Sequence, residues 1–116
     1  MHPISNLPVA VIGAGPVGLA AAAQLLQRGL PVQVFEAGSG PAAHLQGYGH
    51  VRLFSPWRFN IDRAARALLL LEGWQPPADE DALPTAAELR EQYLLPLANS
   101  QALRQRVQYG AVASTR

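Results

Sequence analysis

Three glycines that follow a short apolar run near the start of the chain restrict the fold more than any other feature. The run Val9–Ile12 is typical of a strand that is buried on both faces, and Gly13, Gly15 and Gly18 come directly after it. In a G-x-G-x-x-G turn the first glycine takes the tight bend and the second lets a pyrophosphate approach the backbone. The third lets the helix pack closely on the strand. The pattern therefore predicts a strand, a turn and a helix that together bind a dinucleotide.

The residues after the turn predict a helix whose first turn faces that ligand. Pro16 suits the first helical position, because its missing N–H would have no partner there and its φ already fits a helix. The stretch Val17–Arg28 is rich in alanine and leucine, and Gly29 is placed to end the helix. Free backbone N–H groups and the positive end of the helix dipole make such an N-terminus an anion site, where a cofactor pyrophosphate would lie.

An acidic residue follows the second predicted strand, Val32–Phe35. Glu36 stands 18 residues beyond Gly18, and the fingerprint expects an acid about 20 residues on that accepts hydrogen bonds from the adenosine ribose. A carboxylate there would repel a 2′-phosphate, so the sequence favours FAD or NAD over NADP at this site. The competing interpretation is a glycine-rich turn between a strand and a helix that binds no ligand.

Composition excludes several functions for a chain of 116 residues, which is long enough for one modest domain. The net charge is +1 and no basic cluster is present, which argues against nucleic acid and against an electrostatic membrane contact. Lysine and cysteine are absent, so P-loop, Schiff-base, disulfide and thiolate-metal chemistry are excluded. Glycines and a proline interrupt the apolar stretch Val9–Leu26, so it does not indicate a signal or membrane segment and a cytoplasmic location is expected.

The segment 37–60 shows no sustained helical or strand period, and we interpret it as a long ordered loop. Trp57 and Phe59 could cover a flat ring system, or they could fill the core. Arg52 or Arg58 could neutralise a phosphate, or both could face solvent. The residue pattern alone leaves these alternatives open.

Two helix start signals follow the loop. Asp62 can cap a helix over Arg63–Glu72, with Gly73 closing it. Thr85 and Glu88 have the spacing of a capping box. They predict an amphipathic helix from about residue 86 to 98 that covers the sheet.

The remaining polar groups give no catalytic or metal site. Tyr93 lies on the apolar face of the last predicted helix and is expected in the core, and Arg106–Tyr109 is expected to form a third strand. The acidic cluster at 79–81 is interpreted as a solvated connector. The three histidines match no metal or triad spacing; they are His2, His44 and His50. We therefore predict no metal site and name no catalytic residue.

The residue identities in and around the fingerprint resemble those of a known family. Residues 11–22 and 35–38 resemble the N-terminal FAD-binding domain of flavoproteins with two dinucleotide-binding domains. The stretch 49–62, with 83–85 downstream, resembles a bacterial group of FAD-dependent oxidoreductases that are similar to flavin-containing monooxygenases. The resemblance covers nearly the whole chain, although only the fingerprint and Glu36 are mechanistically specific.

The resemblance implies an α/β fold: a Rossmann-like FAD/NAD(P)-binding domain with a parallel sheet and flanking helices, here incomplete. Residues 1–116 would be the N-terminal FAD-binding domain of a longer flavoprotein, and NAD(P)H would reduce the full enzyme. The larger monooxygenases carry a double glycine and a tryptophan after the acid, a pattern from which residues 40–44 depart. The cofactor-binding residues expected are Gly13, Ala14, Gly15, Pro16, Val17, Gly18, Glu36, Ala37 and Arg52.

The chain is therefore predicted to be the FAD-binding part of an NAD(P)H-dependent flavoprotein oxidoreductase that is similar to monooxygenases. Two alternatives stay open: an NAD-binding dehydrogenase domain, and a non-catalytic module that binds adenine nucleotides. The isolated chain is expected to bind its cofactor without turnover, because a single fingerprint cannot hold a nicotinamide against a flavin. Substrate, electron acceptor and the choice between monomer and homo-oligomer are left open by the sequence.

Overall fold

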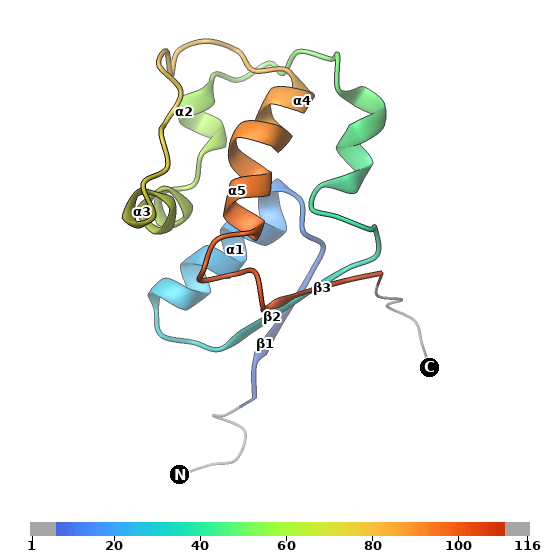
Figure 1. The fold of residues 1–116 in the computed structure, drawn as a ribbon, viewed down its shortest axis with the longest axis vertical. Helices are drawn as coiled ribbons and strands as arrows, with labels where there is room; N and C mark the ends of the chain where they lie inside the picture. Colours follow the sequence, from blue (N-terminus) through green and yellow to red (C-terminus); the bar gives the residue numbers. More distant parts are fainter. Residues whose placement is uncertain (1–6, 111–116) are drawn as a thin grey trace.

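Three parallel strands form the sheet, in the order β1-β2-β3 (Figure 1). A computed structural model describes residues 7–110 of the chain. The strands are β1 (Val9–Ile12), β2 (Val32–Glu36) and β3 (Val107–Tyr109). Val11 pairs with Val34, which in turn pairs with Val107, so the three strands share one register across the sheet. The predicted α/β class with a parallel sheet is confirmed.

The first crossover follows the prediction closely. Helix α1 (Pro16–Gln27) begins with the proline at its first position and connects β1 to β2. Its buried side chains, Leu19, Ala22 and Ala23, pack toward the sheet. Gly29 has φ of 78°, the left-handed conformation that ends many helices and that suits glycine. Small residues on the inner face let the helix lie close to the strands.

The sheet is covered on one face by the described helices (Figure 1). Val11, Val32 and Val34 point to that face and are buried. Along a strand the next residues point to the opposite face, where Ala10 is exposed and Ile12 is 69% exposed. Within residues 7–110, therefore, the second face of the sheet stays open.

The loop predicted for 37–60 contains regular structure, which corrects that interpretation. A 3-10 helix, η2 (Ala43–Tyr48), and a short helix, α2 (Trp57–Asn60), lie within it. Long-range backbone bonds hold the segment, since the N–H of Leu53 donates to the carbonyl of Pro84 (2.8 Å). Such contacts depend on residues far along the chain and leave no local sequence period.

Helix α3 (Arg63–Leu71) confirms the first predicted cap. The carboxylate of Asp62 accepts a hydrogen bond from the N–H of Ala65 (3.0 Å), and Gly73 follows with φ of 85°. The acidic connector pairs with basic residues of the preceding helices: Arg58 with Asp81, and Arg66 with Glu80.

The helix predicted for 86–98 is interrupted in its middle. It consists of α4 (Ala86–Leu89), a π-helical turn η3 (Arg90–Leu94) and α5 (Leu95–Ala98). Pro96 has no N–H to donate to the carbonyl of Gln92, one α-helical turn earlier. The indole N–H of Trp74 donates to that carbonyl instead (2.9 Å). A proline inside the pattern therefore explains the break that the apolar spacing did not predict.

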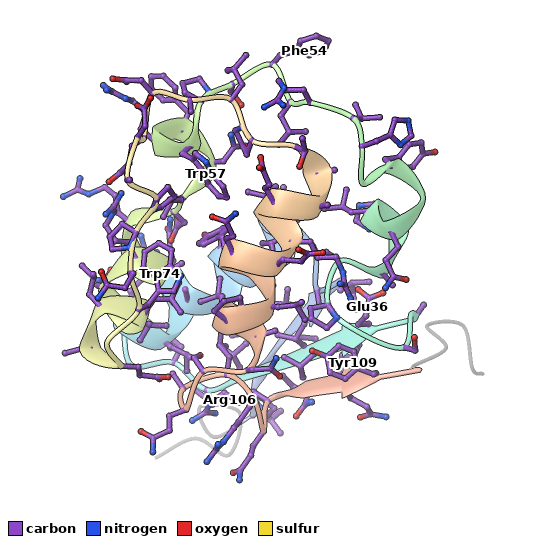
Figure 2. The ribbon with its side chains drawn as sticks, turned by 45° about the horizontal axis from the view of Figure 1, so that its top comes forward. Glu36, Phe54, Trp57, Trp74, Arg106 and Tyr109 are labelled. Atoms are coloured by element: carbon purple, nitrogen blue, oxygen red, sulfur yellow. The ribbon has the colours of Figure 1, made fainter. Side chains whose placement is uncertain are left out.

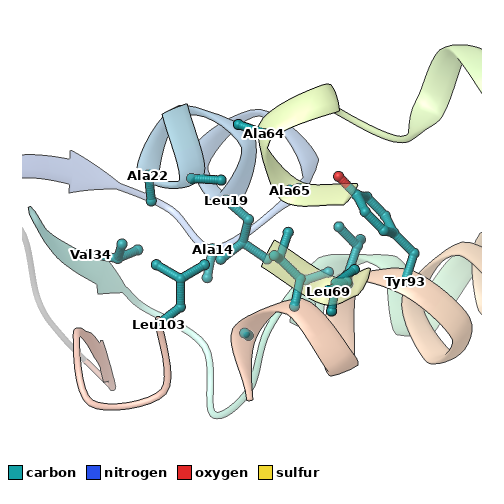
Figure 3. Packing of buried hydrophobic residues seen from close by; sticks show 14 of the residues in the cluster. Ala14, Leu19, Ala22, Val34, Ala64, Ala65, Leu69, Tyr93 and Leu103 are labelled. Atoms are coloured by element: carbon teal, nitrogen blue, oxygen red, sulfur yellow. The ribbon is translucent and has the colours of Figure 1, made fainter. Parts of the chain in front are cut away.

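The core lies between the covered face of the sheet and these helices (Figure 3). Tyr93 is 1% exposed, as predicted for a core residue, and its ring packs 6.4 Å from that of Trp74. Val34, in strand β2, and Leu103 are fully buried. The capping box at Thr85 and Glu88 forms in both directions, so the start of α4 is also as predicted.

Candidate dinucleotide-binding site

The glycine turn has a steric reason for glycine at two of its positions. Gly13 has φ of 98°, a conformation that other residues rarely adopt, and its N–H donates to the carbonyl of Phe35 (2.7 Å). A Cβ on Gly18 would overlap with the carbonyl oxygen of Gly13. The turn therefore brings α1 against β1 as the fingerprint predicts for its first and third glycines.

The N-terminus of α1 carries no side-chain cap from the described residues, and no acidic residue lies in its first turn. Gly15 is the N-cap residue, and its carbonyl accepts the first helical bond, from the N–H of Leu19 (3.0 Å). The N–H groups of Val17 and Gly18 precede that bond, so no carbonyl within the helix can accept them. Together with the helix dipole they form a site suited to an anion.

Glu36 is tied to the turn through its carboxylate. Its Oε1 accepts a hydrogen bond from the N–H of Ala14 (2.6 Å), and its Oε2 accepts one from the N–H of Gly38 (2.7 Å). The carbonyl of Ala14 accepts from the N–H of Ala42 (2.9 Å), and Ala14 is fully buried. Ala14 is thus held by Glu36 through its N–H and by Ala42 through its carbonyl. Its N–H therefore already has an acceptor.

The segment after Glu36 folds back over the turn. Ala42 adopts a left-handed conformation with φ of 51°, which starts the 3-10 helix η2. This brings the exposed ring of His44 beside the helix N-cap: a Cβ on Gly15 would lie 3.2 Å from Cε1 of His44. Sequence spacing gave no reason to place a histidine here.

Two further residues at this edge of the sheet were not singled out by the sequence as site residues. Arg90, in the π-helical turn, donates through Nε to the carbonyl of Pro41 (3.0 Å). Tyr109 pairs in register with Glu36, and both lie on the same side of the molecule in Figure 2. The hydroxyl of Tyr109 is buried and has no hydrogen-bond partner among the described residues. Burial and the charge of Glu36 raise the pKa of Tyr109, and Arg90 opposes this.

Arg52, predicted at the cofactor, makes its described contacts elsewhere. Its guanidinium donates to the carbonyl of Leu83 (2.6 Å), and its backbone forms a bridge with Thr85. Arg58, the alternative, pairs with Asp81. These contacts hold the loop to the connector rather than to the glycine turn.

Trp57 and Phe59 differ in burial, and only Trp57 matches the core interpretation. Trp57 is 5% exposed and belongs to the core, whereas Phe59 is 76% exposed. Phe59 borders a shallow hollow with Pro16 and Val17, at the start of α1. Ala37 lies exposed beside Glu36, at the end of β2.

Residues 7–110 contain neither a metal-binding cluster nor a membrane-spanning helix. No group of three or more His, Asp or Glu side chains is placed there to hold a metal ion. None of the helices in that range has the length and apolar character needed to cross a membrane.

Solved structures with a similar fold include a steroid monooxygenase and a protein named OTEMO. One is an oxidized steroid monooxygenase bound to NADP, with 24% identity, a TM-score of 0.62, and coverage of 87% of this chain and 19% of that one. Another is OTEMO in complex with FAD and NADP, with 23% identity, a TM-score of 0.59, and coverage of 90% and 19%. The chain therefore spans about a fifth of the length of these structures. At this identity the likeness establishes the fold, a Rossmann-like fragment.

Comparison with curated proteins found no match. A family model described as "FAD dependent oxidoreductase" matches residues 8–115, nearly the whole chain. The match includes the glycine turn, Glu36 and the strand that ends at Tyr109. The chain thus belongs to the FAD-dependent oxidoreductase family.

Proposed function

We propose that this chain binds FAD, with the pyrophosphate at the N-terminus of α1 and the adenosine ribose at Glu36. The observation that carries the proposal is the uncapped first turn of α1 beside a strand-end carboxylate, in a member of an FAD-dependent family. The N–H groups of Val17 and Gly18 would donate to phosphate oxygens. Gly15 carries no side chain that would fill the space beside them.

Glu36 is suited to the ribose although it already accepts two backbone hydrogen bonds. Each carboxylate oxygen has two lone pairs, so Oε1 and Oε2 can each accept one more donor. The bonds from Ala14 and Gly38 hold the carboxylate at the mouth of the turn before any ligand arrives. A ribose with free hydroxyls can donate to it, whereas a 2′-phosphate would be repelled.

We further propose that residues 1–116 form the N-terminal FAD-binding domain of a longer NAD(P)H-dependent oxidoreductase. The two similar structures support this, because each is about five times the length of the matched region, one being a steroid monooxygenase bound to NADP and the other holding FAD and NADP. Bound FAD supplies hydride acceptance and electron transfer to an acceptor, while the protein supplies binding and orientation. The residues described here hold the dinucleotide, and the nicotinamide site would lie in other parts of the protein.

The direct test is to titrate the purified protein with FAD and to follow flavin fluorescence and protein heat release. Glu36→Gln keeps the size of the side chain and removes its charge, so FAD should bind about ten- to hundredfold more weakly. FMN, which lacks the adenosine ribose, should bind equally to both proteins.

Glu88→Gln is the matched control. Glu88 also accepts a backbone hydrogen bond, from the N–H of Thr85 (2.8 Å), but it belongs to the capping box of α4. This variant should lose some stability and keep its FAD affinity. Retention of NAD but not FAD by the wild-type protein would contradict the proposal and favour a dehydrogenase domain.

A further inference from the structure

His44 stands where a bound pyrophosphate has to approach the glycine turn. The edge of its ring would lie 3.2 Å from a Cβ on Gly15, the N-cap residue of α1. The side chain is exposed, so its ring can be reached from solvent. An imidazole can donate a hydrogen bond from one nitrogen when neutral and from both when protonated.

The fold holds His44 in this position through backbone bonds. The N–H of Ala42 donates to the carbonyl of Ala14 (2.9 Å), which joins the loop to the glycine turn. Nε of Arg90 donates to the carbonyl of Pro41 (3.0 Å), which joins the same loop to the π-helical turn. The 3-10 helix η2 starts directly after this double attachment, and His44 lies in its first turn.

The turn itself offers few donors to a ligand that has many acceptors. Pro16 has no N–H, and the N–H of Ala14 is bound to Glu36. The N–H groups of Val17 and Gly18 are the neighbouring donors with no acceptor inside the helix. A pyrophosphate has several charged oxygens, so a further donor beside Gly15 would add a charge-assisted hydrogen bond.

On this basis, and resting on the proposed function, we propose that His44 is a phosphate-binding residue whose ring nitrogen donates a hydrogen bond to the pyrophosphate at the glycine turn. His44 thereby distinguishes ligands with a phosphate at this position from ligands without one.

The test compares wild type with His44→Ala and His44→Gln, using FAD and ADP as the two titrated ligands. Both contain the adenosine pyrophosphate, and ADP lacks the flavin. His44→Ala should weaken both ligands by about three- to tenfold. His44→Gln retains an N–H donor and should stay within about threefold of wild type.

His50→Ala is the matched control, because His50 is an exposed histidine that lies just beyond the same 3-10 helix. It should leave both affinities unchanged. The thermal unfolding midpoint of each variant should match that of wild type, since His44 makes no described hydrogen bond that the substitution would remove.

The outcomes separate the two proposals. If wild type binds neither FAD nor ADP, the proposed function fails. If wild type binds both and His44→Ala binds them equally well or more tightly, the role of His44 is overturned and the ring only obstructs the turn. A folded His44→Gln protein as weak as His44→Ala would also overturn a donor role.

Discussion

The N-terminus of α1 differs from the N-termini of α3 and α4 in one respect. Asp62 caps α3 with its carboxylate, and Thr85 with Glu88 forms a complete capping box on α4. Helix α1, the longest of the three, starts at Gly15 without a side-chain cap from the described residues. Side chains therefore satisfy N–H groups at the starts of α3 and α4, whereas those of α1 have no such partner and would meet the phosphate under the proposed function.

The difference separates α1 from the two other helices that start with a side-chain cap. A side-chain cap typically contributes about 1 kcal/mol to stability, and α1 forgoes that contribution. Under the proposed function this leaves access for a phosphate, because a cap carboxylate would occupy the same N–H groups. Substitutions that add a cap to α1, or remove one from α3 or α4, test whether the two kinds of helix start have different roles.

The largest effect is expected from Gly18→Ala. The new Cβ would overlap with the carbonyl oxygen of Gly13, and both atoms belong to rigid backbone. We expect a loss of at least about 3 kcal/mol of unfolding free energy, measured by urea denaturation. Gly47→Ala is the control, because no heavy atom lies within 4 Å of its added Cβ. Equal stability of the two variants would show that the turn is looser than described.

Gly15→Asp would give α1 the kind of cap that α3 has. Its φ of −90° accepts any residue, so the fold should be retained or slightly stabilised. The carboxylate would take the N–H groups and repel phosphate, so FAD affinity should fall by at least about a hundredfold, or about 2.7 kcal/mol. Calorimetric titration that finds unchanged affinity in the folded variant would place the pyrophosphate elsewhere.

Tyr93 links the start of α3 to the core and makes the stability of the fold depend on pH. Its hydroxyl oxygen accepts a hydrogen bond from the N–H of Asp62 (3.1 Å), and burial raises its pKa to about 12. Because the pKa of Tyr93 is higher in the folded protein than its ordinary value of 10.0, Tyr93 contributes to the unfolding free energy. That contribution is fully present below pH 10 and is lost as the pH rises through 12. Two pH units correspond to about 2.7 kcal/mol as an upper bound.

Tyr93→Phe should remove this part of the alkaline loss of stability. Urea unfolding of both proteins at pH 8, 10 and 11 measures the difference, which should shrink as the pH rises. A constant difference between wild type and variant across this range would mean that Tyr93 titrates as freely as an exposed tyrosine.

The smallest effect is expected at the capped helices. Asp62→Ala and Thr85→Ala should each lower the unfolding free energy by about 1 kcal/mol, because each leaves a backbone N–H without its acceptor. FAD affinity should stay the same in both, as measured by fluorescence titration. A cap variant that weakened FAD binding would contradict the division of roles between the helices.

The sequence predicted the first crossover well, because its glycines, proline and acid answer local steric and electrostatic demands. Gly13, Gly18 and Gly29 each stand where the backbone requires them, and both capping signals formed. The 3-10 helix η2 and the position of His44 were not predictable, since bonds to Ala14 and from Arg90 fix that loop. Those partners come from distant parts of the chain.

The break in the last helix shows a different limit. Leu89, Tyr93 and Leu97 recur every four residues and are all buried, as the apolar period predicts. The same period gave no indication of a π-helical turn between them. Pro96 was the available signal, because a proline inside a helix has no N–H to donate to the carbonyl one turn earlier.

The hydrogen bond from Trp74 to the carbonyl of Gln92, beside the π-helical turn, also gives the chain a fluorescence signal. Trp74 donates its indole N–H to Gln92, and its ring lies 6.4 Å from that of Tyr93, so its fluorescence depends on the docking of the connector onto the helix. Trp57, the other tryptophan of the chain, lies in α2 and is buried in the core. A Trp57→Phe protein would therefore report, through Trp74 emission alone, when the helical layer separates.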